Sequence, residues 1–374
     1  MKVHYGKSKA NNLLMHKITP STSKRSGTLD LLRFLAVVFV FFGHYTDTFN
    51  YTYQIVPENL KYMLFSKYAT TALTLFFMIS GYVVTMTSVK RNIQDFVITR
   101  LSRLYPLYWI SCIVAFILPH LFYQNRSYLA EVSLTTFFVN LTMIPSVFLV
   151  QMMNPVFHTL LIELVFYIFI SIIIIFKLWN NIVAVLCFML SICIVTLFTP
   201  TFPLHIAVLP FLAGMVFYLI SAQTLPRRTV YLLLAATYII ALASTTAQKE
   251  QMESFYKGAV VINPWILKVI TSLYYLVFLL ISLKALHIPG RRIYQVLGEL
   301  AYPLYLFHVY FLCFYWYFSK KIQPDVLLFG ILFGTIITSW LINIFLEKPL
   351  SNLAARCLRK LSGEQEKNTR KAII

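Results

Sequence analysis

The chain is a succession of long apolar stretches separated by short polar segments. A helix needs about 20 apolar residues to cross a bilayer. Ten apolar stretches reach this length, so the pattern predicts an all-α, polytopic integral membrane protein with about ten transmembrane helices. An eleventh apolar stretch, residues 132–150, contains several polar positions and a proline, so we interpret it as an interfacial or re-entrant segment. We place these helices at residues 29–49, 69–88, 104–123, 159–177, 180–199, 204–222, 229–246, 264–285, 299–318 and 325–347.

Composition agrees with this pattern. The chain has 374 residues, of which 59% are hydrophobic and only 12% are charged. Soluble domains carry about a quarter charged residues, so a typical soluble enzyme, a disordered chain and a secreted disulfide scaffold are excluded. The five cysteines show no motif spacing. We interpret them as packed side chains rather than as a metal site or a disulfide framework.

The net charge of +19 is a topology signal. If residue 1 is cytoplasmic, most Lys and Arg fall in the inner segments, which is typical of membrane proteins. Both termini are therefore predicted to be cytoplasmic, and a nucleic-acid partner is unnecessary. We divide the chain into a basic cytoplasmic N-tail (1–28), a transmembrane domain (29–349) and a basic cytoplasmic C-tail (350–374).

Ionisable residues inside membrane helices are costly, and each is therefore a candidate for function. The first helix contains Asp30, Arg33 and His44. The spacing from Arg33 to His44 is three helical turns plus about 20°, so the two side chains share a face. Glu163 is predicted at nearly the depth of His44, where a carboxylate and an imidazole can form an acid/base pair. The alternatives are a snorkelling arginine, a packed histidine and a hydrated glutamate.

A second cluster is predicted on the inner side. Arg100 and Arg103 lie three residues apart at the inner end of the third helix. Guanidinium groups bind phosphate oxygens bidentately, although plain anchoring by positive charge is the alternative. Ser80 and Gly81 in the second helix permit close backbone approach, either by a ligand or by another helix.

Two further residues remain candidates. His308 falls near mid-membrane in a tyrosine-rich helix, with Pro303 in what we predict to be its first turn. His308 either lines a cavity or is satisfied by a neighbouring hydroxyl. Glu347 ends the last helix and is interpreted as a partner for the basic cluster.

The basic inner layer and the His/Glu outer layer suggest a donor with an anionic head and a long arm. A coenzyme A thioester that docks from the cytoplasm fits this outline as a hypothesis. Its acyl group would have to reach most of the way across the membrane.

The same residues resemble the acyltransferase family 3 membrane proteins. The first-helix signature of that family is an Arg, ten residues and a His, as in Arg33 and His44. Further landmarks follow in order, although His158, Ala301 and Phe307 depart from common family residues. These landmarks are Ser80–Tyr82, Arg100 and Arg103, Thr159–Tyr167, Tyr302–His308 and Glu347–Pro349.

The resemblance implies transfer of an acyl group, commonly acetyl, from cytoplasmic acyl-CoA across the bacterial inner membrane. The usual acceptor is a hydroxyl of an extracytoplasmic glycan, such as lipopolysaccharide O-antigen, exopolysaccharide or a lipid-linked saccharide; some relatives acylate small molecules. No metal is implied. We assign catalysis to His44, Glu163 and Arg33, donor binding to Arg100, Arg103, Ser80 and Gly81, and keep Asp30, Tyr167, His308 and Glu347 as further candidates.

Two other classes of function are open. A transporter or flippase for a lipid-linked saccharide would be expected to show internal repeats and interrupted helices, and neither is clear in the sequence. A non-catalytic scaffold would not need Arg33 and His44 on one helix face. Membrane lipid is an expected partner, and a homodimer is left open.

Overall fold

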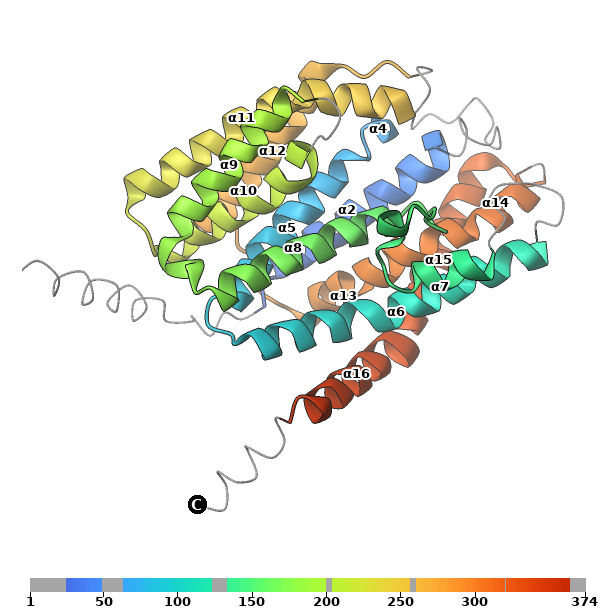
Figure 1. The fold of residues 1–374 in the computed structure, drawn as a ribbon. Coiled ribbons are helices and arrows are strands. Elements are labelled where there is room, and N and C mark those ends of the chain that lie inside the picture. The colour runs from blue at the N-terminus through green and yellow to red at the C-terminus, as the bar shows by residue number, and fades with distance from the viewer. Residues whose placement is uncertain are drawn as a thin grey trace, which may run out of the picture. The chain divides into compact units, whose positions relative to one another are not determined.

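The computed structural model describes residues 25–48, 63–122, 133–199, 204–255, 260–319 and 321–363 (Figure 1). The described residues form helices and turns without any strand, and ten helices are long and apolar enough to cross a membrane. The predicted all-α, polytopic architecture is therefore confirmed. The outer parts of both predicted tails, residues 1–24 and 364–374, lie outside the described residues.

The chain divides into two compact units. Unit 1 comprises Met1–Ala36, Thr70–Lys90 and Ile172–Gly298, and unit 2 comprises Val37–Ala69, Arg91–Ser171 and Glu299–Ile374. Three helices contribute residues to both units. They are α2 (Gly27–Gly43), α8 (Phe157–Ile175) and α13 (Arg292–Phe307).

Unit 1 is a bundle centred on α10, which contacts α5, α9, α11 and α12. Gly81 of α5 and Gly214 of α10 permit the closest of these approaches, because a Cβ at Gly81 would lie 2.9 Å from backbone atoms of Phe211. The elements are α5 (Thr71–Ser88), a 3-10 turn η3 (Leu178–Asn181), α9 (Ile182–Leu197), α10 (Leu204–Ala222), α11 (Arg227–Phe255) and α12 (Pro264–Ser282).

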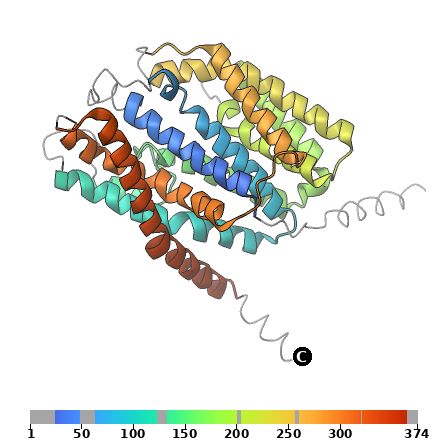
Figure 2. The same cartoon turned by 180° about the vertical axis from the view of Figure 1, so that it is seen from behind.

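Unit 2 is organised around the long helix α6 (Ile93–Phe122), along which α16 packs (Figure 2). Its other elements are the spanning helix α15, which continues through η5 into α16, and several shorter helices and irregular turns. They are η1 (His44–Thr48), α4 (Met63–Ser66), α7 (Leu134–Asn140), η2 (Pro145–Phe148), η4 (His308–Phe311), α14 (Leu312–Phe318), α15 (Pro324–Ile342), η5 (Asn343–Glu347) and α16 (Lys348–Leu361).

Two helices begin earlier than the sequence predicts. Helix α6 begins at Ile93 rather than at 104, because Asn92 accepts a hydrogen bond from the backbone N–H of Asp95 (2.7 Å) and caps the helix. Arg100 and Arg103 therefore lie within the helix. Pro303 lies in the interior of α13 rather than in its first turn, because the helix already begins at Arg292.

The helices within the segment 132–150 are too short to span a membrane. It consists of α7 and η2, joined by a turn in which Met143 has a positive φ of 68°. Asn140 is fully buried; its amide donates to Thr136 O and Gln151 O, and its Oδ1 accepts from Met153 N. This amide fixes the segment as a folded loop of unit 2.

Interrupted helices, which the sequence did not reveal clearly, are present at three candidate residues. His44 opens the π-helical turn η1, His308 opens the 3-10 turn η4, and Glu347 closes the π-helical turn η5. Such irregular turns are frequent at functional sites, because they redirect side chains that a regular helix would hold in register.

Candidate active site

The imidazole rings of His44 and His308 lie next to each other in unit 2. Their centroids are 5.1 Å apart and their planes are inclined by 59°. His44 is half-buried and His308 is fully buried. Two histidines that are 264 positions apart in the sequence thus form one pair of ionisable groups within a largely apolar surrounding.

The hydrogen bonds of His308 define its tautomer. Its Nδ1 lies 2.8 Å from Tyr305 O and 3.2 Å from Leu304 O. A carbonyl oxygen can only accept, so Nδ1 carries a hydrogen, and in the neutral form of the ring the lone pair is on Nε2. No hydrogen-bond partner of the buried Nε2 is present among the described residues. His308 therefore presents a basic nitrogen inside the unit.

Aromatic residues hold this pair in place. Tyr45, which follows His44, donates its hydroxyl proton to His308 O at 2.6 Å and stacks on Phe41 with 4.3 Å between ring centroids. The ring of Tyr305 lies 6.0 Å from that of His308, and its hydroxyl lies 2.7 Å from Thr159 Oγ1. The irregular turns at both histidines are thereby tied together and to α8.

The second group of unit 2 connects Arg100, Tyr167 and Glu163. Tyr167 donates a hydrogen bond to Glu163 Oε1 at 2.5 Å. The guanidinium carbon of Arg100 lies 5.4 Å from the centre of the Tyr167 ring and 5.6 Å from that of Phe96. Arg100 is 6% exposed. Arg100 therefore makes cation–π contacts with two aromatic rings, one of which, Tyr167, is hydrogen-bonded to Glu163.

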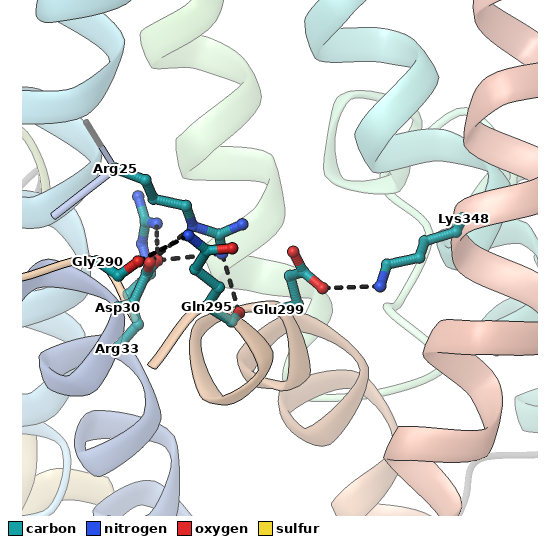
Figure 3. A network of polar contacts seen from close by, with 7 residues as sticks. All are labelled: Arg25, Asp30, Arg33, Gly290, Gln295, Glu299 and Lys348. Carbon is teal, nitrogen blue, oxygen red and sulfur yellow. Dashed lines mark hydrogen bonds and ion pairs between the residues drawn. The ribbon is translucent and has the colours of Figure 1, made fainter. Parts of the chain in front are cut away.

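Arg103, one turn further along α6, is exposed, in contrast to Arg100. It interacts electrostatically with Glu347 of η5. The Glu347 carboxylate also accepts a hydrogen bond from Asn343 Nδ2 at 2.8 Å, and the neighbouring Lys348 forms an ion pair of 2.8 Å with Glu299 (Figure 3). The Arg103 guanidinium interacts with the Glu347 carboxylate but is exposed, so it is accessible to an anionic ligand.

In unit 1, Asp30 is the centre of an ion cluster at the start of α2 (Figure 3). Arg25 Nε lies 2.6 Å and Arg33 Nη1 lies 3.5 Å from the Asp30 carboxylate, which is 2% exposed. Arg25 also donates to Gln295 O at 3.0 Å. Asp30 thus attaches the N-terminal end of α2 to the beginning of α13. Arg25 and Gln295 did not emerge from the sequence, although Arg25 lies only five residues before Asp30.

Ser80 and Gly81, predicted as donor-binding residues, lie in the middle of α5 in unit 1. Gly81 packs against the backbone of Phe211, and an added Cβ would collide with it. This contact gives Gly81 a packing role. The donor-binding prediction for the two residues remains a prediction.

The structure therefore brings together some of the predicted residues and separates others into different units. His44, Glu163, Arg100, Arg103, Tyr167, His308 and Glu347 belong to unit 2, whereas Asp30, Arg33, Ser80 and Gly81 belong to unit 1. His44 lies beside His308, and Glu163 accepts a hydrogen bond from Tyr167. Within the described parts of the chain, no group of three or more His, Cys, Asp or Glu is arranged to hold a metal ion.

Comparison with known families agrees with these motifs. A family model described as an acyltransferase domain, that of acyltransferase family 3, matches residues 27–344. The chain belongs to acyltransferase family 3. The match begins at the first residue of α2 and ends within η5, so it includes every candidate residue except Glu347. This acyltransferase family 3 protein is a multi-pass membrane acyltransferase that uses an acyl donor. No curated protein and no solved structure matches the chain.

Proposed function

We propose that the protein is an O-acyltransferase of the bacterial inner membrane. It moves an acyl group, most simply acetyl, from cytoplasmic acyl-CoA to a hydroxyl of an extracytoplasmic glycan such as lipopolysaccharide O-antigen or exopolysaccharide. The observation that carries the proposal is the His44–His308 pair, in which two imidazole bases lie with their ring centroids 5.1 Å apart and Tyr305 O orients the ring of His308. Acyl transfer to a hydroxyl needs such a base.

His44 takes the proton of the acceptor hydroxyl as the hydroxyl oxygen attacks the thioester carbonyl carbon. The C–S bond then breaks, and the proton passes to the leaving thiolate of coenzyme A. His308 acts through His44, as a positioning residue. The hydrogen bond from His308 Nδ1–H to Tyr305 O fixes the orientation of the His308 ring beside His44. Glu163 is held by Tyr167, whose ring packs against Arg100, and supplies negative charge to the same unit. A positioned base of this kind contributes about 10²–10⁴ in rate.

The donor phosphates are assigned to Arg103, because its guanidinium is exposed on α6. Arg100 is buried against two aromatic rings and positions Tyr167. The distribution of Lys and Arg supports an orientation with both termini in the cytoplasm. In this orientation Arg103 lies on the side from which acyl-CoA arrives, whereas the acceptor glycan is on the other side.

Replacing Arg103 by alanine is expected to raise the KM for acyl-CoA about 10- to 150-fold and to leave kcat nearly unchanged, because a charge-assisted hydrogen bond to phosphate contributes about 1.5–3 kcal/mol. Initial rates at varied acyl-CoA concentration in proteoliposomes measure this. Arg228→Ala, at an exposed arginine of unit 1, is the matched control. A KM for acyl-CoA that is the same in both variants would limit Arg103 to a role in topology.

The acceptor is tested by mass analysis of surface glycans from cells with and without the gene. Loss of the mass of one acyl group per repeat unit is expected on deletion, and the chain should restore it while the His44→Ala variant should not. Unchanged glycans together with turnover of acyl-CoA in the presence of a small hydroxylated molecule would instead identify a small-molecule acceptor.

The interrupted helices at His44, His308 and Glu347 also occur in transporters, so transport of a lipid-linked saccharide is the second candidate. The two functions differ in the fate of the donor. Movement of the saccharide across proteoliposomes without consumption of acyl-CoA would favour transport.

A further inference from the structure

The last helix of unit 2, α16, is amphipathic and basic. Its sequence, KPLSNLAARCLRKL, contains four Lys or Arg and no Asp or Glu. It lies beyond residue 344, where the family match ends, so the match does not cover it. None of its residues is buried, and α6 is its main neighbour. Much of the surface of α16 is therefore accessible to something other than the described part of the chain.

Helix α16 begins at the surface of the membrane. Helices α15 and α16 are joined by η5 without a break, and together they form a run of 38 residues from Pro324 to Leu361. At 1.5 Å per residue this run is roughly 57 Å long, whereas the hydrocarbon core of a bilayer is about 30 Å thick. The 19 residues of α15 almost cross this core by themselves. The residues of α16 therefore lie at the level of the headgroups or beyond it.

One exposed row of α16 is apolar. Leu353 and Leu361 are 56% and 84% exposed, and Cys357 lies exposed between them. A step of four residues turns a helix by only about 40°, so these three side chains form one leucine stripe about 80° wide. Ala354 and Leu358, next to this stripe, are half-buried on the side of α6. An apolar stripe with this exposure is typical of a surface that lipid or a partner covers.

The other edge of the leucine stripe is basic. Lys360, Arg356 and Arg359 are exposed, and they follow Leu353 around the helix at about 20°, 60° and 120°. We refer to these three residues as the basic row. Long basic side chains can extend from a helix to the level of lipid phosphates while the apolar side chains beside them enter the acyl layer. The basic row is thus complementary to an anionic surface.

The position of α16 favours a lipid surface over any other partner. Phe345, in the η5 part of the last spanning run, is 68% exposed, and Leu353 is again exposed only eight residues later. No linker separates α16 from the span, so the headgroup layer is always within reach of the basic row. Lys and Arg clusters on an amphipathic helix directly after a span are typical of binding to anionic lipids.

We propose that α16 lies in the membrane surface and binds the headgroups of anionic phospholipids. The leucine stripe enters the outer part of the acyl layer, and the basic row contacts the lipid phosphates. In the orientation proposed above, these lipids belong to the cytoplasmic leaflet. The inference goes beyond acyl transfer and does not depend on it, because lipid binding by α16 requires neither the donor, the acceptor nor the histidine pair.

The test uses a fluorescent probe on the native Cys357 of the full-length protein, in nanodiscs that each hold one copy. Cys187→Ser removes the other exposed cysteine. The discs contain either phosphatidylcholine alone or equal parts of phosphatidylcholine and phosphatidylglycerol. A doxyl group high on the lipid acyl chain quenches a probe inside the membrane, and acrylamide quenches a probe in water.

The ratio of membrane-embedded to water-exposed helix, measured with these two quenchers, is expected to rise at least about 10-fold in the anionic discs. The reason is that each basic residue at an anionic surface strengthens binding about 5-fold. An equal ratio in the two kinds of disc would overturn the proposal.

A triple variant connects this effect to the basic row. Arg356→Gln, Arg359→Gln and Lys360→Gln together remove three exposed charges and leave the leucine stripe intact. In this variant the ratio should differ by less than about 2-fold between the two kinds of disc, because the electrostatic attraction is lost. A response to phosphatidylglycerol as large as that of the parent protein would show that the basic row does not bind the headgroups.

The matched control removes the same number of charges from unit 1. Arg227→Gln, Arg228→Gln and Arg291→Gln are substitutions at exposed positions outside α16 and should leave the response of the probe unchanged. If both triple variants lost the response, the net charge of the protein would account for it, and a site on α16 would be rejected.

A second copy of the chain is the other occupant that fits the leucine stripe. Discs with one copy exclude it, and discs with two copies allow it. A probe on Cys357 that is exposed to water in all one-copy discs, and protected only in two-copy discs, would identify the stripe as a subunit interface and contradict the proposal. Protection by phosphatidylglycerol in one-copy discs supports it.

Discussion

Replacing His44 by alanine is expected to lower the kcat of acyl transfer by about 10²–10⁴, because the general base is lost while the rest of the site is retained. The KM for acyl-CoA should change little, since we assign the donor phosphates to Arg103 and only proton transfer to His44. The measurement is transfer of radiolabelled acyl groups from acyl-CoA to purified acceptor glycan in proteoliposomes. His287→Ala, at an exposed position, provides a matched histidine substitution with expected wild-type turnover.

His308 gives the same experiment a second, more specific result. A glutamine at position 308 retains a polar side chain of similar length but has no basic ring nitrogen. Since His308 acts through His44 (ring centroids 5.1 Å apart), kcat should fall by about 10–10² while the KM for acyl-CoA stays constant. A purely structural role would instead lower the amount of folded protein and leave kcat per folded molecule intact. Turnover retained in both variants would reject the histidine pair as the catalytic centre.

Replacing Gly81 by alanine is expected to destabilise the protein by about 1–3 kcal/mol, the usual cost of overpacking. An added Cβ would lie 2.9 Å from the backbone carbonyl carbon and Cα of Phe211, and backbone atoms cannot move aside as a flexible side chain can. Helices α5 and α10 would have to separate. The measurement is the midpoint of thermal unfolding in detergent, followed by loss of the monodisperse peak in size-exclusion chromatography.

Gly330→Ala is the matched control within α15, because nothing lies within 4 Å of a Cβ at that position. There alanine should leave the unfolding midpoint unchanged or raise it slightly, since alanine favours helix by up to about 1 kcal/mol over glycine. An equal shift for the two variants would show that glycine at position 81 has no packing function.

The irregular turns explain why helix periodicity alone did not predict the direction of some side chains in the site. A regular helix fixes the direction of every side chain by its position in the sequence. At His44, His308 and Glu347 the hydrogen-bond pattern changes to π or 3-10, so the rotation per residue is no longer 100°. The apolar sequences around these residues carry no signal for such a change, because hydropathy is the same in both geometries.

The boundary of α6 illustrates a different reason. Residues 93–103 are polar enough to be taken as a loop next to the membrane, and only the cap at Asn92 shows that the helix begins there. Local hydrogen bonds therefore decide where a helix starts, whereas hydropathy decides where it is inside lipid. Because the helix begins at Ile93, Arg100 and Arg103 both lie on it, and they differ in exposure.

The sequence by itself determined the features that depend on local composition. Ten apolar stretches require ten helices, because a backbone in lipid must satisfy its own hydrogen bonds. The ordered motifs from Arg33 to Glu347 indicated the family, since they are strings of neighbouring residues. Tertiary structure alone decided which side chains meet: His44 with His308, Arg100 with Tyr167, and Asp30 with Arg25. These pairs depend on how helices pack and where they deform, and that is set by contacts between residues far apart in the chain.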